Sequence, residues 1–227
     1  QRVGPTRAIQ SGKISQSSMK NAVALVTLLS LVSAFWLLYI SADLISDSLI
    51  WIYLGLTVLC IVAAISYTVG KSAYGYSGLG DIMVFLFFGC LSVIGVFTLY
   101  GIHFEILTLM PAFTIGFWSA AVLNLNNMRD IVNDADSSKR TLAVQLGAIR
   151  AKYYHFSLIL VGLCIWTTLN AVYIYLNDNW VFLIGIFPTL FLFPHLKKVI
   201  KIDDPVMYDP ELKKVALITF SSSILFA

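Results

Sequence analysis

Long apolar segments follow one another through the whole sequence and decide what kind of fold it can adopt. Seven are present, and each of the first five reaches the roughly 20 residues that a helix needs to cross a bilayer. The sixth is shorter and contains Pro188 and Pro194, and the seventh reaches the final residue. Their approximate ranges are 19–40, 49–70, 79–100, 106–127, 153–176, 179–196 and 213–227.

The composition supports the same class of fold. Hydrophobic residues make up 59% of the 227 residues and charged residues only 12%, whereas soluble proteins carry about 25% charged residues. The mean hydropathy is +0.84. We therefore predict an all-α, polytopic membrane helix bundle that forms a single transmembrane domain over residues 1–227, and we exclude a soluble domain.

The positive charges of the sequence occupy alternate connections between the apolar segments. The other connections contain acidic residues and a histidine but no Lys or Arg. By the positive-inside rule, we expect residues 1–18, 71–78, 128–152 and 197–212 to face the cytoplasm. The 15 basic residues in or beside these connections are Arg2, Arg7, Lys13, Lys20, Lys71, Arg129, Lys139, Arg140, Arg150, Lys152, Lys197, Lys198, Lys201, Lys213 and Lys214.

Three polar residues follow one another at intervals of four around the end of the fourth apolar segment: Asn126, Asp130 and Asp134. On a helix, this spacing places them on one face. Magnesium prefers oxygen ligands and usually takes one or two carboxylates together with the phosphates of a substrate. We therefore predict that Asp130 and Asp134 bind Mg²⁺, with a carbonyl oxygen from Asn126 or Asn127.

Cations in the same predicted cytoplasmic connections can neutralise the remaining charge of a diphosphate: Arg7, Lys71, Lys139 and Arg140. Tyr67 precedes Lys71 by four residues, so the phenol and the ammonium group can point the same way. Neutralising a leaving diphosphate lowers the barrier to breaking its C–O bond. The apolar bundle beside the site can hold a lipid tail and keep water away from a carbocation.

Each of these residues also has a simpler interpretation. The two aspartates can form a solvated helix end beside Arg129, and Tyr67 and Lys71 can be anchors at the membrane interface. The remaining cations can be orienting charges or lipid-headgroup contacts. Residues that we expect to be solvated or interfacial, without a role in the site, are Asp136, His155, Asp203, Asp204, Asp209 and Glu211. We expect His195, near Pro194 and Lys197, to be a helix-end residue.

Several stretches resemble a known family. Asn126-Asn-Met-Arg-Asp-Ile-Val-Asn-Asp134, followed by Lys139-Arg-Thr-Leu-Ala-Val-Gln-Leu-Gly147, resembles the second aspartate-rich motif of UbiA-type intramembrane prenyltransferases. Tyr67-x-x-x-Lys71 is similar to their tyrosine–lysine motif. Residues 2–14 and 78–89 resemble the 1,4-dihydroxy-2-naphthoate polyprenyltransferase branch of this family. The resemblance covers nearly the whole chain.

This resemblance implies Mg²⁺-dependent aromatic prenylation in menaquinone biosynthesis. A polyprenyl diphosphate and 1,4-dihydroxy-2-naphthoate would react with loss of diphosphate and CO2. The implied metal ligands are Asp130 and Asp134, which also count as catalytic together with Tyr67 and Lys71 across the site. The implied diphosphate or substrate ligands are Lys139, Arg140, Arg7, Asn126 and Asn127.

The sequence departs from the family pattern at one point. The family has nine helices and a first motif of the form Asn-Asp-x-x-Asp after the second helix, and no such motif occurs in this sequence. We expect seven of nine transmembrane segments to be present, with two helices and the first motif upstream of Gln1. We also expect residues 1–227 alone to be inactive.

Three alternatives use the same residues differently. A transporter has polar residues at mid-membrane depth, and an intramembrane aspartyl protease needs aspartates in two facing spans, whereas Asp130 and Asp134 share one segment end. A sister prenyltransferase with another ring acceptor, such as 4-hydroxybenzoate or a chlorophyll- or haem-type ring, remains open. We expect a multi-pass protein of the bacterial inner membrane, in contact with lipid, with its site facing the cytoplasm and with no nucleic-acid partner.

Overall fold

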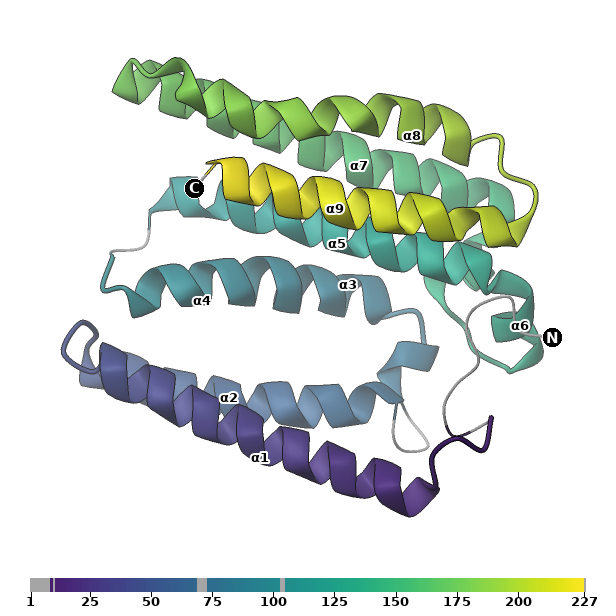
Figure 1. Ribbon diagram of the computed structural model, residues 1–227, viewed down its shortest axis with the longest axis horizontal. Coiled ribbons are helices and arrows are strands. Elements are labelled where there is room, and N and C mark those ends of the chain that lie inside the picture. The colour runs from purple at the N-terminus through teal and green to yellow at the C-terminus, as the bar shows by residue number, and fades with distance from the viewer. Residues whose placement is uncertain (1–8, 10, 69–72, 103–104, 227) are drawn as a thin grey trace.

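The computed structural model describes residues 9, 11–68, 73–102 and 105–226. Within these ranges the chain is helical and contains no strand (Figure 1), which confirms the predicted all-α bundle. Its α-helices are α1 (Gln16–Ser41), α2 (Asp47–Thr68), α3 (Gly80–Val84), α4 (Ser92–Leu99), α5 (Leu109–Arg129), α6 (Ile131–Asp136), α7 (Leu142–Asn177), α8 (Leu192–Val199) and α9 (Tyr208–Phe226). The 3₁₀-helices are η1 (Tyr74–Tyr76), η3 (Ile106–Thr108), η4 (Trp180–Phe191) and η5 (Pro205–Met207), and η2 (Phe85–Leu91) is a π-helix.

Six stretches of helix are long and apolar enough to cross a membrane, and they coincide with the first six predicted segments. The seventh predicted segment lies within α9. In the part of the chain that the structure describes, α9 does not meet the same criteria, because Asp209, Glu211, Lys213 and Lys214 occupy its first two turns. The six stretches are Gln16–Ser41, Asp47–Thr68, Gly80–Leu99, Ile106–Arg129, Leu142–Asn177 and Trp180–Val199.

Helix α5 lies at the centre of the bundle. It packs against α7, α9 and η2, and Figure 1 shows α5 and α9 between the α7–α8 pair and the span that contains α3 and α4. Trp118 on α5 is fully buried, and its Nε1 donates to the carbonyl oxygen of Ile159 on α7 at 3.4 Å. Gly162 makes this close contact possible, since a Cβ there would collide with the Trp118 indole.

The positively charged connections gather at one end of the bundle. The right-hand side of Figure 1 contains the start of α1 and three connections. These connections join α2 to α3, α5 through α6 to α7, and α8 to α9. This is the grouping that the charge pattern predicts. The predicted connection 128–152 is itself largely helical, because it contains α6 and the first turns of α7, which kinks at Gly147 (φ 75°).

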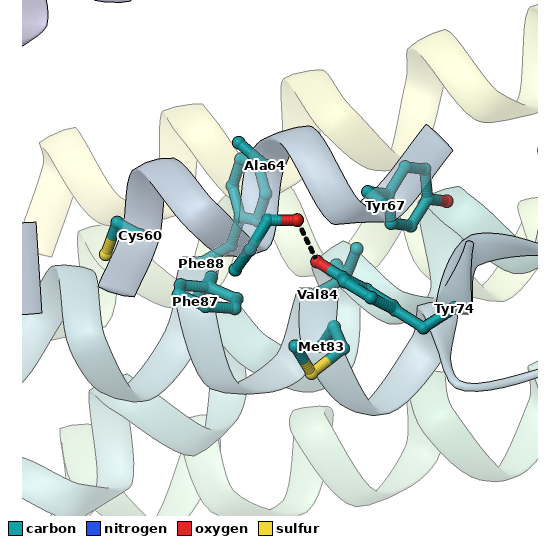
Figure 2. A pocket seen from close by; sticks show the side chains of 9 residues that line it. Cys60, Ala64, Tyr67, Tyr74, Met83, Val84, Phe87 and Phe88 are labelled. Atoms are coloured by element: carbon teal, nitrogen blue, oxygen red, sulfur yellow. Dashed lines mark hydrogen bonds between the residues drawn. The ribbon is translucent and has the colours of Figure 1, made fainter. Parts of the chain in front are cut away.

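Several cavities border the span Gly80–Leu99, and two of them lie near its first turn. The first, the α2–α3 cavity, has a volume of about 500 Å³ and lies between α2, η1, α3 and η2, with Tyr67 and Tyr74 at one end and Cys60 at the other (Figure 2). The second, the α5–α9 cavity, has a volume of about 750 Å³ and extends along α5 from Asn126 to Ile115. Val84 lines both cavities.

Candidate active site

The aspartate-rich motif spans a break between two helices. Helix α5 ends at Arg129, Asp130 has a φ of −95° and a ψ of 9°, and α6 begins at Ile131. The backbone N–H of Asp130 donates to the carbonyl oxygen of Asn126 at 3.1 Å, and that of Asp134 donates to Asp130 at 2.8 Å. The three predicted residues thus remain linked at four-residue spacing, although they do not belong to one regular helix.

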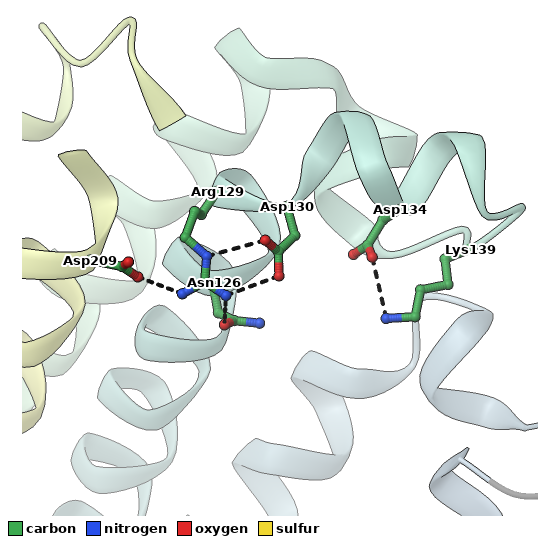
Figure 3. A network of polar contacts seen from close by, with 6 residues as sticks. All are labelled: Asn126, Arg129, Asp130, Asp134, Lys139 and Asp209. Atoms are coloured by element: carbon green, nitrogen blue, oxygen red, sulfur yellow. Dashed lines mark hydrogen bonds and ion pairs between the residues drawn. The ribbon is translucent and has the colours of Figure 1, made fainter. Parts of the chain in front are cut away.

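Arg129 holds the first half of this motif in place (Figure 3). Its Nε and Nη2 donate to the two carboxylate oxygens of Asp130 at 3.1 and 2.9 Å, and Nη2 also donates to Asn126 Oδ1 at 2.7 Å. Its Nη1 donates to Asp209 at the start of α9. The side chains of Arg129 and Asp130 are only 6% and 4% exposed, so this bidentate pair fixes both the position and the orientation of the Asp130 carboxylate.

Asp134 pairs with the first cation that follows it. Lys139 Nζ lies 3.3 Å from Asp134 Oδ1, and the backbone N–H of Lys139 donates to the Asp134 carbonyl oxygen at 2.8 Å. The same ammonium group lies 5.0 Å from the centre of the Tyr76 ring, within the range of a cation–π contact. The turn between α6 and α7 therefore presents a carboxylate and a cation side by side, as predicted for a diphosphate site.

The connection between α2 and α3 docks onto this turn. The Arg140 backbone N–H donates to the Tyr76 carbonyl oxygen at 2.8 Å, and Gln145 Nε2 donates to the Arg140 carbonyl oxygen at 2.8 Å. Gly78 has a φ of +85°, which favours glycine, and a Cβ there would collide with the Gln145 amide. These contacts bring two connections about 60 residues apart in sequence onto the same side of the site.

Tyr67 lies at the end of α2, within electrostatic reach of both Asp81 and Asp134. Its ring packs edge-on against Tyr74, with 5.4 Å between ring centres. The structure therefore places Tyr67 at the same end of the bundle as the aspartate-rich motif. Lys71, its predicted neighbour, lies outside the described residues.

The other predicted site residues are placed as follows. The Arg140 side chain is exposed, and only its backbone takes part in the contacts above. Asn127 is buried, and among the described residues no hydrogen bond joins its side chain to the Arg129 network. Arg7 lies outside the described residues.

Asp209 is a member of the site that the sequence does not reveal. Its side chain is 45% exposed, in agreement with the expected solvated position, but its carboxylate also accepts a hydrogen bond from Arg129 across 80 residues of sequence. Arg129 itself has a local signal, because it lies three residues after Asn126 and directly before Asp130. No local pattern indicates the contact with Asp209.

A second polar cluster lies fully buried behind the site, where solvated or interfacial residues were expected. His155 Nε2 lies 2.8 Å from His195 Nε2, and His195 Nδ1 lies 2.7 Å from Glu211 Oε2. All three side chains are 0% exposed, so the predicted solvated or interfacial positions of His155 and Glu211 are wrong. His195 was expected at a helix end but lies within α8. The cluster joins α7, α8 and α9.

The charge of Glu211 is stabilised despite its burial. Burial by itself would raise its pKa, but hydrogen bonds from His195, Lys198 and Lys214 outweigh this effect and lower the pKa of Glu211 to about 2. The two lysines lie 2.9 and 3.0 Å from Glu211 Oε1. Glu211 is therefore a carboxylate at neutral pH, held by three donors.

The oxygen donors of the motif fit a magnesium ion that is shared with a phosphate ligand. Within the described ranges, no three His, Cys, Asp or Glu side chains are grouped closely enough to hold a metal by themselves. Asp130, Asp134 and Asn126 nevertheless supply hard oxygen atoms at one end of the bundle. Magnesium commonly takes one or two carboxylates and completes its shell with substrate phosphates and water, so this donor set suits it.

An all-helical membrane bundle with an aspartate-rich motif and cations at one end is the architecture of an intramembrane prenyltransferase. The model of the UbiA prenyltransferase family matches residues 1–207. The chain therefore belongs to the UbiA prenyltransferase family, as its motifs predict.

Two bacterial relatives resemble the chain along almost its whole length. The 1,4-dihydroxy-2-naphthoate octaprenyltransferase of Haemophilus influenzae is 38% identical over 227 residues, which is 100% of this chain and 72% of that protein. The enzyme of the same name from Escherichia coli is 36% identical over 225 residues, which is 99% of this chain and 71% of that protein. A third, from Mycobacterium tuberculosis, is 35% identical over 169 residues, 71% of this chain and 52% of that protein. No solved structure matches the chain.

Proposed function

We propose that this protein transfers a polyprenyl group from a polyprenyl diphosphate to 1,4-dihydroxy-2-naphthoate, with loss of diphosphate and CO2, as a step in menaquinone biosynthesis. The names of its relatives support the reaction. The observation that carries the proposal is the side-by-side placement of Asp134 and Lys139, at 3.3 Å, beside the buried Asp130–Arg129 pair. A carboxylate and a cation in this arrangement can provide a metal ligand and a diphosphate counter-ion.

The α5–α9 cavity supplies a place for the prenyl tail. It begins at Asn126, beside the aspartates, and continues to Ile115. These positions are eleven residues apart on α5, or about 16 Å along the helix axis. Its other walls include Val84, Phe88 and Phe220, so an apolar chain attached to a diphosphate at Asn126 can lie along α5.

The proposed chemistry assigns each polar group a task. Asp130, Asp134 and Asn126 would hold magnesium, which neutralises charge on the leaving diphosphate when it is bound. Lys139 would stabilise the same leaving group, with Arg140, Arg7 and Lys71 as further cations, and Tyr67 would lie across the site. We infer that Asn127, which is buried, contributes indirectly by holding α5 in position.

The proposed reaction breaks one C–O bond and forms one C–C bond. The C–O bond between the prenyl carbon and the diphosphate breaks, and its electron pair leaves with the diphosphate. The electron-rich ring then forms a C–C bond from the carbon that bears the carboxylate. Loss of CO2 from that carboxylate returns an electron pair to the ring and restores its aromaticity. The apolar cavity keeps water away from the allylic cation.

We place the protein in the bacterial inner membrane with this site on the cytoplasmic side. The positive-inside rule supports the orientation, because the charged connections lie together at the end of the bundle that carries the site (Figure 1). Labelling of an engineered cysteine near Lys139 with an impermeant reagent, in intact cells and in inverted vesicles, tests it. Labelling in intact cells would contradict the proposal.

The reaction is tested with the intact protein in liposomes, a labelled polyprenyl diphosphate and 1,4-dihydroxy-2-naphthoate, with and without Mg²⁺. We expect a prenylated, decarboxylated product only when magnesium is present. A parallel reaction with 4-hydroxybenzoate distinguishes a sister prenyltransferase. Product from that acceptor alone, or no product from either, would refute the proposal.

A further inference from the structure

A buried carboxylate that the proposed chemistry does not use lies at the start of α3. Asp81 is only 3% exposed, and within the described part of the chain its Oδ1 has no hydrogen-bond partner. Buried polar atoms are nearly always paired, and leaving one unpaired costs free energy. An ionised carboxylate can only accept hydrogen bonds, so this oxygen can take a donor from a bound ligand.

The surroundings of Asp81 connect it to the active site. Asp81 interacts electrostatically with the phenol groups of Tyr67 and Tyr154, and Tyr67 interacts in the same way with Asp134. A Cβ built on Gly80 would lie 3.5 Å from the Tyr67 hydroxyl oxygen, so the start of α3 touches this phenol. Asp81 therefore lies beside the same tyrosine as the aspartate-rich motif.

The helix that carries Asp81 forms the wall between the two cavities. Val84 follows Asp81 by three residues, which places both on the same face of α3, and Val84 lines the α2–α3 cavity as well as the α5–α9 cavity. Tyr67 and Tyr74 close the end of the α2–α3 cavity (Figure 2). Its volume of about 500 Å³ is within the usual range of small-molecule sites.

We propose that the unpaired oxygen of Asp81 accepts a hydrogen bond from a ring hydroxyl of the aromatic acceptor. This inference rests on the proposed function, because the acceptor of that reaction brings such a donor to the site. An ionised diphosphate has no hydrogen-bond donor, and the prenyl tail has no polar hydrogen. A flat dihydroxy ring fits beside the Tyr67 and Tyr74 phenols, and a carboxylate on its hydroxyl increases the electron density of the attacking ring.

Binding measurements with matched acceptors and variants test this assignment. The ligands are 1,4-dihydroxy-2-naphthoate and its two analogues that each lack one ring hydroxyl. Wild-type protein and Asp81→Asn are compared, with Asp136→Asn as the control, because Asp136 is an exposed carboxylate on α6. All are measured as intact protein in liposomes by equilibrium binding, and steady-state rates give the KM of the prenyl diphosphate.

We expect Asp81→Asn to weaken binding of the dihydroxy acceptor by on the order of 10- to 100-fold, the range for a hydrogen bond to a charged group. Wild-type protein should discriminate against one of the two analogues by a similar factor, and Asp81→Asn should lose that discrimination. The KM of the prenyl diphosphate and the magnesium dependence should change less than twofold. Asp136→Asn should behave like wild type.

Three results would overturn the assignment. They are unchanged acceptor binding in Asp81→Asn, equal wild-type affinity for the dihydroxy acceptor and both analogues, or a shifted magnesium dependence, which would make Asp81 a metal ligand. If Asp81→Asn does not fold, the affinities of the wild-type protein for the acceptor and its two analogues still test the assignment. A wild-type protein that forms no prenylated product would refute the proposed function, whereas an active one without analogue discrimination would refute only the role of Asp81.

Discussion

Replacing Glu211 with glutamine should destabilise the packing of α7, α8 and α9 against one another. The substitution keeps the size of the side chain but removes the charge that three donors share. His195 Nδ1 lies 2.7 Å from Glu211 Oε2, with both side chains 0% exposed, so water cannot replace this bond. The lysines differ, because the Lys198 and Lys214 side chains are 44% and 37% exposed and can be rehydrated.

The expected loss of stability follows from these exposures. A buried hydrogen bond to a charged group contributes about 2 kcal/mol, and a partly exposed ion pair contributes about 0.5 kcal/mol. One bond of the first kind and two of the second give about 3 kcal/mol. In a protein of this size, this corresponds to a decrease in Tm of roughly 6–12 °C.

Thermal unfolding of the purified protein in detergent micelles, followed by circular dichroism, measures this loss. Glu105→Gln is a matched control, because Glu105 is the other glutamate of the chain and is exposed. Its Tm should stay near that of wild type. A decrease in Glu211→Gln no larger than that in Glu105→Gln would refute the reasoning, since it would mean that the buried charge contributes nothing.

Three further outcomes are expected. Asp134→Asn should lower the rate of prenyl transfer about 100-fold or more and raise the magnesium concentration needed, since it loses a metal-binding carboxylate; a rate near wild type in the labelled-diphosphate assay would contradict this. Gly78→Ala should lower the Tm by several degrees, because alanine at φ +85° is strained by about 1–2 kcal/mol and would collide with the Gln145 amide, whereas Gly55→Ala meets open space and should not; equal Tm values would argue against it. Glu211 has a folded-state pKa of about 2 against 4.5 for the free side chain, so the stability that it provides is present above pH 4.5 and decreases as the pH falls towards 2; Glu211→Gln should show less of this decrease in melting curves, and parallel curves would count against it.

The membrane bundle and the position of its motif could be predicted because both have local signals. Apolar segments of spanning length predict helices wherever they occur, and the first six coincide with helices long and apolar enough to span. Asp134 and Lys139 are five residues apart, so their pairing needs only the turn between them. Periodicity and proximity in sequence were sufficient for these features.

The contacts across the bundle could not be predicted, because they join helices that are distant in sequence. Asp209 and Glu211 stand among lysines, a pattern that indicates a solvated loop, yet packing of α9 against α5 and α8 gives both of them partners. The break at Asp130 is similarly hidden, since the residues on either side of it have ordinary helical spacing. These outcomes depend on which helices become neighbours, which hydropathy does not specify.

The bond between Arg129 and Asp209 also sets the order in which a working site can form during synthesis. Asn126, Arg129 and Asp130 are made long before Asp209, and the buried guanidinium gains its fourth oxygen partner only when α9 packs against α5. We expect a nascent chain that ends before residue 208 to hold its aspartates in a looser arrangement. The capacity to bind a diphosphate would then arise late in membrane insertion, when α9 also completes the cavity proposed for the prenyl tail.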